Sequence, residues 1–169
     1  MIRNSGSLFI TGFMGAGKTT IARYLSSRMG LPWMDIDSRI QKQENCTIAE
    51  LFRKQGENRF RHLERQAVAN IKQPHIVSLG GGAFLQSGIR EIISQSGISI
   101  FLDVPFELLW TRVSGQKKRP LVQSYGELKL LYQKRYFYYL LSDFTCHIDA
   151  LSFPVHTVNH ILNFTRLSK

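Results

Sequence analysis

A glycine-rich run between an apolar segment and an amphipathic segment constrains this chain most strongly. Residues 12–19 read GFMGAGKT and fit the pattern G-x-x-x-x-G-K-[ST]. The run follows the apolar, β-rich segment Ser7–Thr11 and opens residues 19–29, whose apolar side chains recur at helical spacing. In that context the glycines let successive backbone N–H groups point at phosphate oxygens, and the helix N-terminus favours the same anion. The run therefore predicts a cradle for a nucleoside triphosphate rather than a plain turn between strand and helix.

The side chains of the run predict how that nucleotide would be held. The ammonium group of Lys18 would reach the β- and γ-phosphates, where it also serves catalysis, and the hydroxyl of Thr19 is placed to bind Mg²⁺. We expect ATP and Mg²⁺ as cofactors. The expected nucleotide-binding residues of the cradle are Gly15, Ala16, Gly17, Lys18, Thr19 and Thr20.

The rest of the chain alternates short apolar runs with longer amphipathic stretches. The apolar runs predict further strands at residues 33–37, 75–79, 98–103 and 146–150, with helical patterns between them. Strands joined by helices of this length need crossover connections, and crossovers produce a parallel sheet. We expect an α/β fold with three layers, in which helices flank a five-stranded parallel sheet. Residues 1–169 form a single domain in this interpretation, with a helical excursion at 38–72 and a loop at 114–124.

The excursion carries its own helix signals. The sequence TIAE at residues 47–50 is typical of a capping box, in which the Thr hydroxyl and the Glu carboxylate each accept a bond from the other's backbone N–H. It predicts a short helix that ends before Gly56, followed by a longer amphipathic helix over residues 57–72.

Composition limits the partners and the compartment. The 22 Lys and Arg residues exceed the 12 Asp and Glu residues, which gives a net charge of +10 and indicates an anionic partner. Hydrophobic residues make up 43% of the chain, too many for an intrinsically disordered protein. Cys46 and Cys146 lack metal-site or disulfide-framework spacing, so we expect reduced thiols and a cytoplasmic protein. The sequence contains no run of about 18 apolar residues, and no membrane span is expected.

Two carboxylates follow the second predicted strand. Asp35 and Asp37 lie two positions apart in WMDID, so on a strand they would point to the same side. The carboxyl ends of parallel strands face the ligand crevice, which places both acids in front of the cradle. One acid suits the Mg²⁺ shell, and the other can take a proton from an attacking hydroxyl or hold that hydroxyl in line. The alternative is that these residues cap the helix that follows.

Three arginines and a glycine triplet are further candidates. Arg61, Arg119 and Arg135 each stand near other charged or aromatic residues, and an arginine fork binds carboxylate or phosphate through two hydrogen bonds. Each could instead be an ordinary solvated surface residue. The glycines at 80–82 directly follow a predicted strand and would let a small ligand approach the backbone closely.

Taken together, these features resemble the shikimate kinase family over about residues 7–165. The matching pieces occur in the family's order and are GFMGAGKTT, DID, FRKQGENRFRHLE, SLGGGA, RPL and LYQKRY. The resemblance implies the P-loop kinase fold and transfer of the γ-phosphoryl group of ATP to the 3-hydroxyl of shikimate. The aromatic run at residues 136–139 departs from the more polar sequence that the family usually has after the arginine of its long helix.

For the acceptor, the resemblance implies specific roles. Asp37 would bind the acceptor hydroxyls and act as the base, Arg61 and Arg135 would clamp the carboxylate, and Gly81 and Gly82 would offer backbone N–H groups. The apolar walls of the acceptor pocket would be Phe52 and Phe60.

For the nucleotide, the resemblance ties Asp35 to the Mg²⁺ shell together with Thr19. Arg119, in the lid formed by residues 114–124, would reach the phosphate in transfer and so belongs with Asp37 and Lys18 among the catalytic residues. Arg112 and Pro154 match the family positions that flank the adenine, although this match is looser than the others.

Two other functions are compatible with parts of the sequence. A related kinase acting on another hydroxy acid, such as gluconate, would share the cradle but not the combination of DID, GGG and RPL. A basic nucleotide-binding module that controls nucleic-acid binding would explain the net charge of +10. The motif set favours the shikimate kinase interpretation, for which we expect a monomer that binds a small-molecule acceptor and neither nucleic acid nor membrane.

Overall fold

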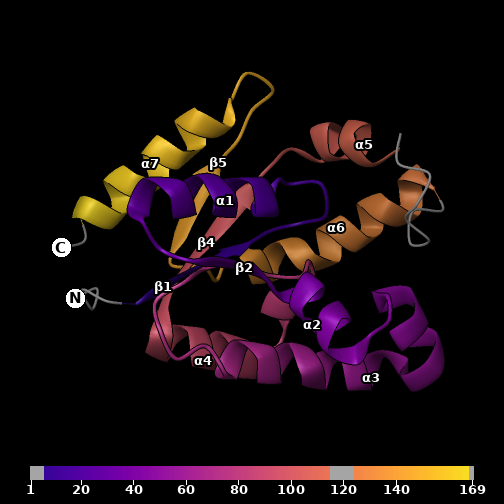
Figure 1. The fold of residues 1–169 in the computed structure, drawn as a ribbon. Coiled ribbons are helices and arrows are strands. Elements are labelled where there is room, and N and C mark those ends of the chain that lie inside the picture. Colours follow the sequence, from indigo (N-terminus) through magenta and orange to yellow (C-terminus); the bar gives the residue numbers. More distant parts are fainter. Residues whose placement is uncertain (1–5, 115–123, 168–169) are drawn as a thin grey trace.

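The computed structural model describes residues 6–114 and 124–167 (Figure 1). Its elements alternate along the chain as the apolar periodicity predicted. In order they are β1 (Ser7–Thr11), α1 (Lys18–Met29), β2 (Trp33–Asp35), α2 (Ile36–Glu44), α3 (Ile48–Ala69), β3 (Ile76–Ser78), the 3₁₀ turn η1 (Ala83–Leu85), α4 (Ser87–Ser96), β4 (Gly97–Asp103), α5 (Phe106–Ser114), α6 (Tyr125–Tyr139), β5 (Phe144–His147) and α7 (Pro154–Leu167).

The sheet has five parallel strands in the order β2-β3-β1-β4-β5, which confirms the predicted fold class. The central strand β1 is buried along its whole length, with Leu8 opposite Ile76 on one side and Ile98 on the other. A strand covered on both faces needs a continuous apolar run, and SLFIT supplies one.

Helices cover both faces of the sheet and complete the three layers (Figure 1). The helices α1 and α7 pack against each other on one side, while α4 packs against β4 and α3 on the other. The glycine-rich run of residues 12–19, the P-loop, follows β1, and other segments follow β2 and β3. These segments therefore gather at the carboxyl end of the sheet, where parallel folds bind ligands.

The predicted excursion is an α2–α3 pair that packs together beside this end of the sheet (Figure 1). The capping box is confirmed: the Glu50 N–H donates to the Thr47 hydroxyl at 3.2 Å, and the Thr47 N–H donates to the Glu50 carboxylate at 2.8 Å. The predicted break is also confirmed, because Gly56 has non-helical φ 78° and ψ 169° inside α3.

Two strands differ from the sequence prediction by more than one residue at an end. The strand expected at 33–37 ends at Asp35, because the Asp35 side chain accepts a bond from the Ser38 N–H at 3.0 Å and caps α2. The last strand lies at Phe144–His147 rather than 146–150. It pairs with β4 from Phe144 onward, so Phe144 and Thr145 already belong to it.

Part of the predicted lid lies outside the described residues. Arg119 is among the residues at 115–123, so the structure does not test its predicted role. Within the described ranges, no helix is both long and apolar enough to cross a membrane.

Candidate active site

The P-loop joins β1 to α1 and is held by its own lysine. Lys18 is the first residue of α1, and its Nζ donates to the carbonyl oxygens of Gly12 and Phe13 at 2.9 Å each. Gly15 has a φ of 80°, and an added Cβ there would lie 2.8 Å from Cγ1 of Val113. A side chain at that position would be strained and crowded, so the tight curl of the loop requires glycine.

A cleft lies beside this loop on the α7 side. Its volume is about 270 Å³, and Nη1 of Arg112 closes one edge by donating to the Gly15 carbonyl at 3.2 Å. The structure brings together six of the residues predicted to bind nucleotide. The cleft is lined by Gly15, Ala16, Gly17, Thr20, Arg112 and Pro154, and also by Ile21, Ile148, Ser152 and Thr157, which the sequence did not identify.

A cluster of oxygen atoms lies where α1 meets the ends of β2 and β3. The Thr19 hydroxyl donates to Oδ2 of Asp35 at 2.8 Å, and the Ser78 hydroxyl donates to the same oxygen at 3.0 Å. Asp35 and Ser78 are opposite each other in the pairing of β2 with β3. Ser78 was missed in the sequence, because its contact with Asp35 depends on the pairing of β2 with β3.

These oxygens fit Mg²⁺. Hydroxyl and carboxylate groups are ligands that Mg²⁺ prefers, and this ion usually keeps waters and substrate phosphates in its shell instead of taking a full protein cage. The described residues accordingly contain no group of three or more His, Cys, Asp or Glu side chains that could hold a metal. Thr19 and Asp35 could therefore hold the ion, while Ser78 donates to the same carboxylate.

Asp37 lies beyond the end of the strand that carries Asp35. It lies in the first turn of α2, and an added Cβ on Gly80 would lie 2.6 Å from its Oδ1. The expectation that both acids lie on one strand is therefore wrong, because β2 ends at Asp35. Asp35 turns to the P-loop threonine, whereas Asp37 lies over the glycine triplet.

The glycine triplet runs directly beside the P-loop. An added Cβ on Gly81 would lie 3.8 Å from the Gly12 carbonyl oxygen and 3.8 Å from the Met14 nitrogen. The phosphate cradle and the glycine triplet next to Asp37 are therefore neighbours. Transfer between two bound ligands requires that their sites adjoin in this way.

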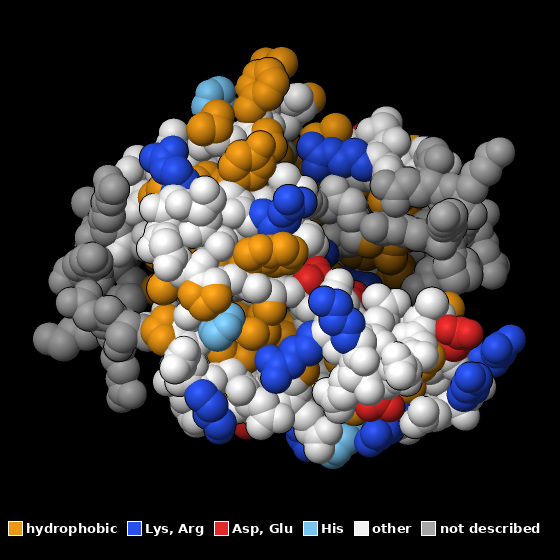
Figure 2. All heavy atoms as spheres, viewed as in Figure 1, with side chains coloured by type: hydrophobic (Ala, Val, Ile, Leu, Met, Phe, Trp, Pro, Cys, Tyr) orange, Lys and Arg blue, Asp and Glu red, His pale blue; other side chains and the backbone are white. Residues whose placement is uncertain are grey.

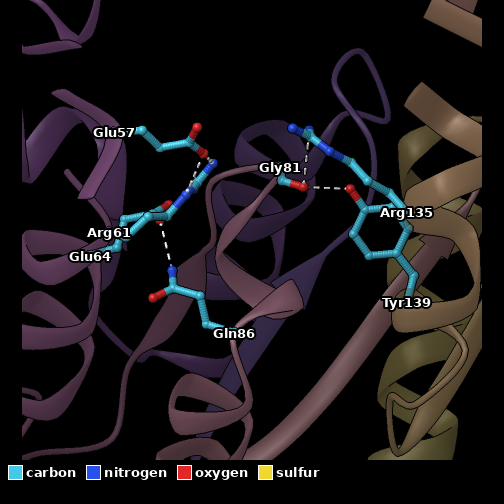
Figure 3. Close-up of polar contacts among 7 residues, drawn as sticks. All are labelled: Glu57, Arg61, Glu64, Gly81, Gln86, Arg135 and Tyr139. Carbon is cyan, nitrogen blue, oxygen red and sulfur yellow. Dashed lines mark hydrogen bonds and ion pairs between the residues drawn. The ribbon is translucent and has the colours of Figure 1, made fainter. Parts of the chain in front are cut away.

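The two arginines of the predicted clamp, Arg61 and Arg135, lie on opposite sides of this triplet (Figure 3). Arg61, on α3, lies across Gly82, where an added Cβ would be 2.6 Å from Nη2. Arg135, on α6, approaches from the other side, and its Nη1 donates to the Gly81 carbonyl at 3.4 Å. Both guanidinium groups are partly buried beside the glycines, and each is a group that binds carboxylate through two hydrogen bonds.

Comparisons with known proteins identify the family. A family model described as shikimate kinase matches residues 14–165. The shikimate kinase of Bartonella quintana is 36% identical over 157 residues, which cover 90% of this chain and 74% of that protein. The shikimate kinase of Persephonella marina is 34% identical and covers 95% of this chain and 99% of its own.

The chain belongs to the shikimate kinase family. Among solved structures, the shikimate kinase of Acinetobacter baumannii in complex with shikimate is similar with a TM-score of 0.86 and 30% identity. The match covers 98% of this chain and 96% of that one. The P-loop kinase fold expected from the sequence is therefore confirmed.

This shikimate kinase family member contains a buried acid that the sequence interpretation did not single out. Glu64 is fully buried and accepts bonds from Arg61 at 2.6 Å and from Gln86 at 3.0 Å. Burial raises the pKa of Glu64 to about 7, against the opposing effect of the Arg61 guanidinium. The signal in the sequence was its position three residues after Arg61, which puts both on one face of a helix.

Arg61 is held in place by acids on both sides. Its Nε and Nη2 donate to Oε1 of Glu57 at 3.0 and 2.7 Å, while Glu64 holds Nη1 (Figure 3). The predicted apolar walls lie next to it: the rings of Phe52 and Phe60 are 5.0 Å apart, and the guanidinium carbon is 5.3 Å from the Phe60 ring. The role of these two rings toward the acceptor stays a prediction.

The basic character of the surface is dispersed in the view that Figure 2 shows. Lys and Arg side chains are separated there by neutral and hydrophobic ones and form no continuous stripe.

Proposed function

We propose that this protein transfers the γ-phosphoryl group of ATP to the 3-hydroxyl of shikimate, giving shikimate 3-phosphate and ADP in the pathway to chorismate and the aromatic amino acids. Membership of the shikimate kinase family makes it an ATP-dependent small-molecule kinase. The observation that carries the finer assignment is the arrangement around Gly81, which has the P-loop on one side and Arg61, Arg135 and Asp37 around the same triplet.

Phosphoryl transfer asks the protein for position and charge more than for covalent chemistry. Lys18 would leave its resting contacts with the loop carbonyls and bind the β- and γ-phosphates. Asp37 would hold the attacking hydroxyl in line and take its proton. Its place over Gly80 supports this role, because that segment adjoins the phosphate cradle.

The acceptor would be fixed by its carboxylate. Arg61 and Arg135 would bind the carboxylate oxygens from two sides, and the N–H groups of Gly81 and Gly82 would complete the site. The absence of side chains on these glycines supports this, since the Arg61 guanidinium occupies the space that a Cβ on Gly82 would need. Two guanidinium groups around one small site favour an anionic acceptor over a neutral polyol.

Thr19 and Asp35 would hold Mg²⁺. When bound, the ion neutralises charge on the phosphate oxygens of ATP. Asp35 is already tied to Thr19 and Ser78, so its carboxylate is oriented before the nucleotide arrives. Arg119 stays a sequence-based proposal for the transferred phosphate, because it lies outside the described residues.

A substrate panel tests the acceptor. The protein is mixed with Mg-ATP and with shikimate, gluconate or no acceptor, and ADP release is followed. We expect kcat/KM for shikimate to exceed that for gluconate by about 100-fold or more, because the two monocarboxylates differ in shape and in hydroxyl placement. Preferred turnover of gluconate would replace the acceptor assignment and leave the kinase assignment standing.

The partner and compartment predictions extend this proposal. We propose a monomeric enzyme of the cytoplasm that binds its acceptor and ATP. The free cysteines support a reducing compartment, with Cys146 buried and Cys46 half-buried. Light scattering of the purified protein measures the oligomeric state directly.

A further inference from the structure

Two donors from one helix meet at a single carbonyl oxygen in the glycine triplet. The Tyr139 hydroxyl donates to the Gly81 carbonyl at 2.5 Å, and Nη1 of Arg135 donates to the same oxygen at 3.4 Å (Figure 3). The two residues are four positions apart on α6, so they lie one above the other on the same face. The contact links the long helix to the segment that also adjoins the P-loop.

The Tyr139 side chain is held in place by the core. Its side chain is fully buried, and its ring stacks on Phe101 of β4 with a centroid distance of 5.1 Å and an interplanar angle of 27°. Burial raises the pKa of Tyr139 to about 12, against the opposing effect of the nearby Arg135 guanidinium. The phenol therefore keeps its proton at neutral pH and remains a donor.

The two contacts differ in strength. An O–H···O bond at 2.5 Å is close, whereas an N–H···O contact at 3.4 Å is beyond the usual range of 2.7–3.2 Å and is easily given up. The carbonyl is thus already satisfied by the phenol, and the guanidinium makes only a secondary contact with it.

We propose that Tyr139 is a positioning residue for acceptor binding: its hydroxyl satisfies the Gly81 carbonyl and so leaves the Arg135 guanidinium available for the acceptor carboxylate. The inference rests on the role proposed above for Arg135. Without the hydroxyl, Arg135 becomes the nearest donor left to a partly buried carbonyl. Leaving a buried carbonyl without a hydrogen bond costs free energy, so the carbonyl would retain its contact with Arg135. The acceptor would then have to displace that contact before it could bind.

The variant Tyr139→Phe removes the hydroxyl and keeps the stacked ring. We expect KM for shikimate to rise roughly 3- to 10-fold, the range that one lost hydrogen bond allows, with kcat and KM for ATP within about twofold of the wild type. Tyr136→Phe is the matched control, because Tyr136 also lies on α6 but donates to Asp103 at 3.2 Å, away from the glycines. The control should leave all three constants unchanged. A parallel rise in KM for ATP, or an equal effect of the control, would mean general damage to α6 and overturn the inference.

A double-mutant cycle separates this inference from the proposal beneath it. If Tyr139 acts through Arg135, then adding Tyr139→Phe to Arg135→Ala should leave kcat/KM for shikimate within about twofold of Arg135→Ala alone. Independent, multiplying losses would overturn the positioning role. An Arg135→Ala variant with unchanged kcat/KM for shikimate would instead overturn the clamp role of Arg135. Loss in Arg135→Ala without loss in Tyr139→Phe would overturn the Tyr139 inference alone.

Discussion

The guanidinium of Arg61 occupies the space that any side chain at position 82 would need. An added Cβ on Gly82 would lie 2.6, 2.7 and 2.9 Å from Nη2, Nη1 and Cζ of Arg61. These atoms belong to the far end of a flexible side chain, so a methyl group at this position would displace the guanidinium and leave the backbone of the core in place.

Gly82→Ala is therefore expected to weaken acceptor binding selectively. We predict a rise of about 10-fold in KM for shikimate, as expected for the loss of a charge-assisted contact, with KM for ATP within about twofold. Steady-state kinetics with each substrate varied in turn measures both constants. Gly126→Ala is the matched control, since an added Cβ there meets no atom within 4 Å. Equal KM values for shikimate in the two variants would contradict the placement of Arg61 at the acceptor site.

Asp37→Asn tests the group that lies over Gly80. Asn keeps the size of the side chain but cannot take a proton from the acceptor hydroxyl, so we expect kcat to fall by about 10²- to 10⁴-fold. ATP affinity, measured by calorimetric titration, should stay within about twofold because Asp37 does not line the nucleotide cleft. Turnover close to that of the wild type would remove Asp37 from the catalytic residues.

Asp35→Asn tests the proposed Mg²⁺ site without losing the helix cap. Asn caps a helix about as well as Asp, so the unfolding midpoint should stay near that of the wild type. The Mg²⁺ concentration for half-maximal activity should rise by about 10-fold, and chelation of Mg²⁺ should abolish turnover. Thr19→Ser, which keeps the hydroxyl, serves as the control with a near-normal Mg²⁺ requirement. An unchanged requirement in Asp35→Asn would exclude Asp35 from the Mg²⁺ shell.

The raised pKa of Glu64 predicts a specific pH dependence of the free energy of unfolding. Its pKa is raised by burial from 4.5 to about 7, so between these values the folded protein holds a proton that the unfolded chain has released. The free energy of unfolding should then fall as pH rises through this window, by at most roughly 1.4 kcal/mol for each pH unit. Glu64→Gln cannot ionise and should lack this fall. Denaturant unfolding of both proteins at several pH values measures it, and a wild-type-to-variant difference independent of pH would contradict the assignment.

Much of the fold followed from local sequence signals. SLFIT before a glycine run predicted a strand followed by the P-loop, because buried parallel strands need continuous apolar residues. Thr47 and Glu50 predicted the start of α3 through the capping box, and Gly56 predicted its break. These features depend on neighbours in the sequence, so the sequence alone identifies them.

The relations across the fold did not follow from the sequence. WMDID is compatible with a strand through Asp37, and only the bond from the Ser38 N–H shows that Asp35 ends the strand as a cap. The contact of Tyr139 with Gly81 joins residues 58 positions apart, and no local pattern reports such a pair. Ser78 could not be identified from the sequence for the same reason, because its partner Asp35 lies on the neighbouring strand, far away in the sequence.

The central claim is that the P-loop and the glycine triplet serve one reaction, with shikimate as acceptor. The most direct measurement is the rate of ADP release from Mg-ATP with and without shikimate, together with phosphorus NMR of the product. We predict ADP release that depends on shikimate, with one shikimate 3-phosphate formed for each ADP. ADP release at the same rate without shikimate, or no release with it, would contradict the account.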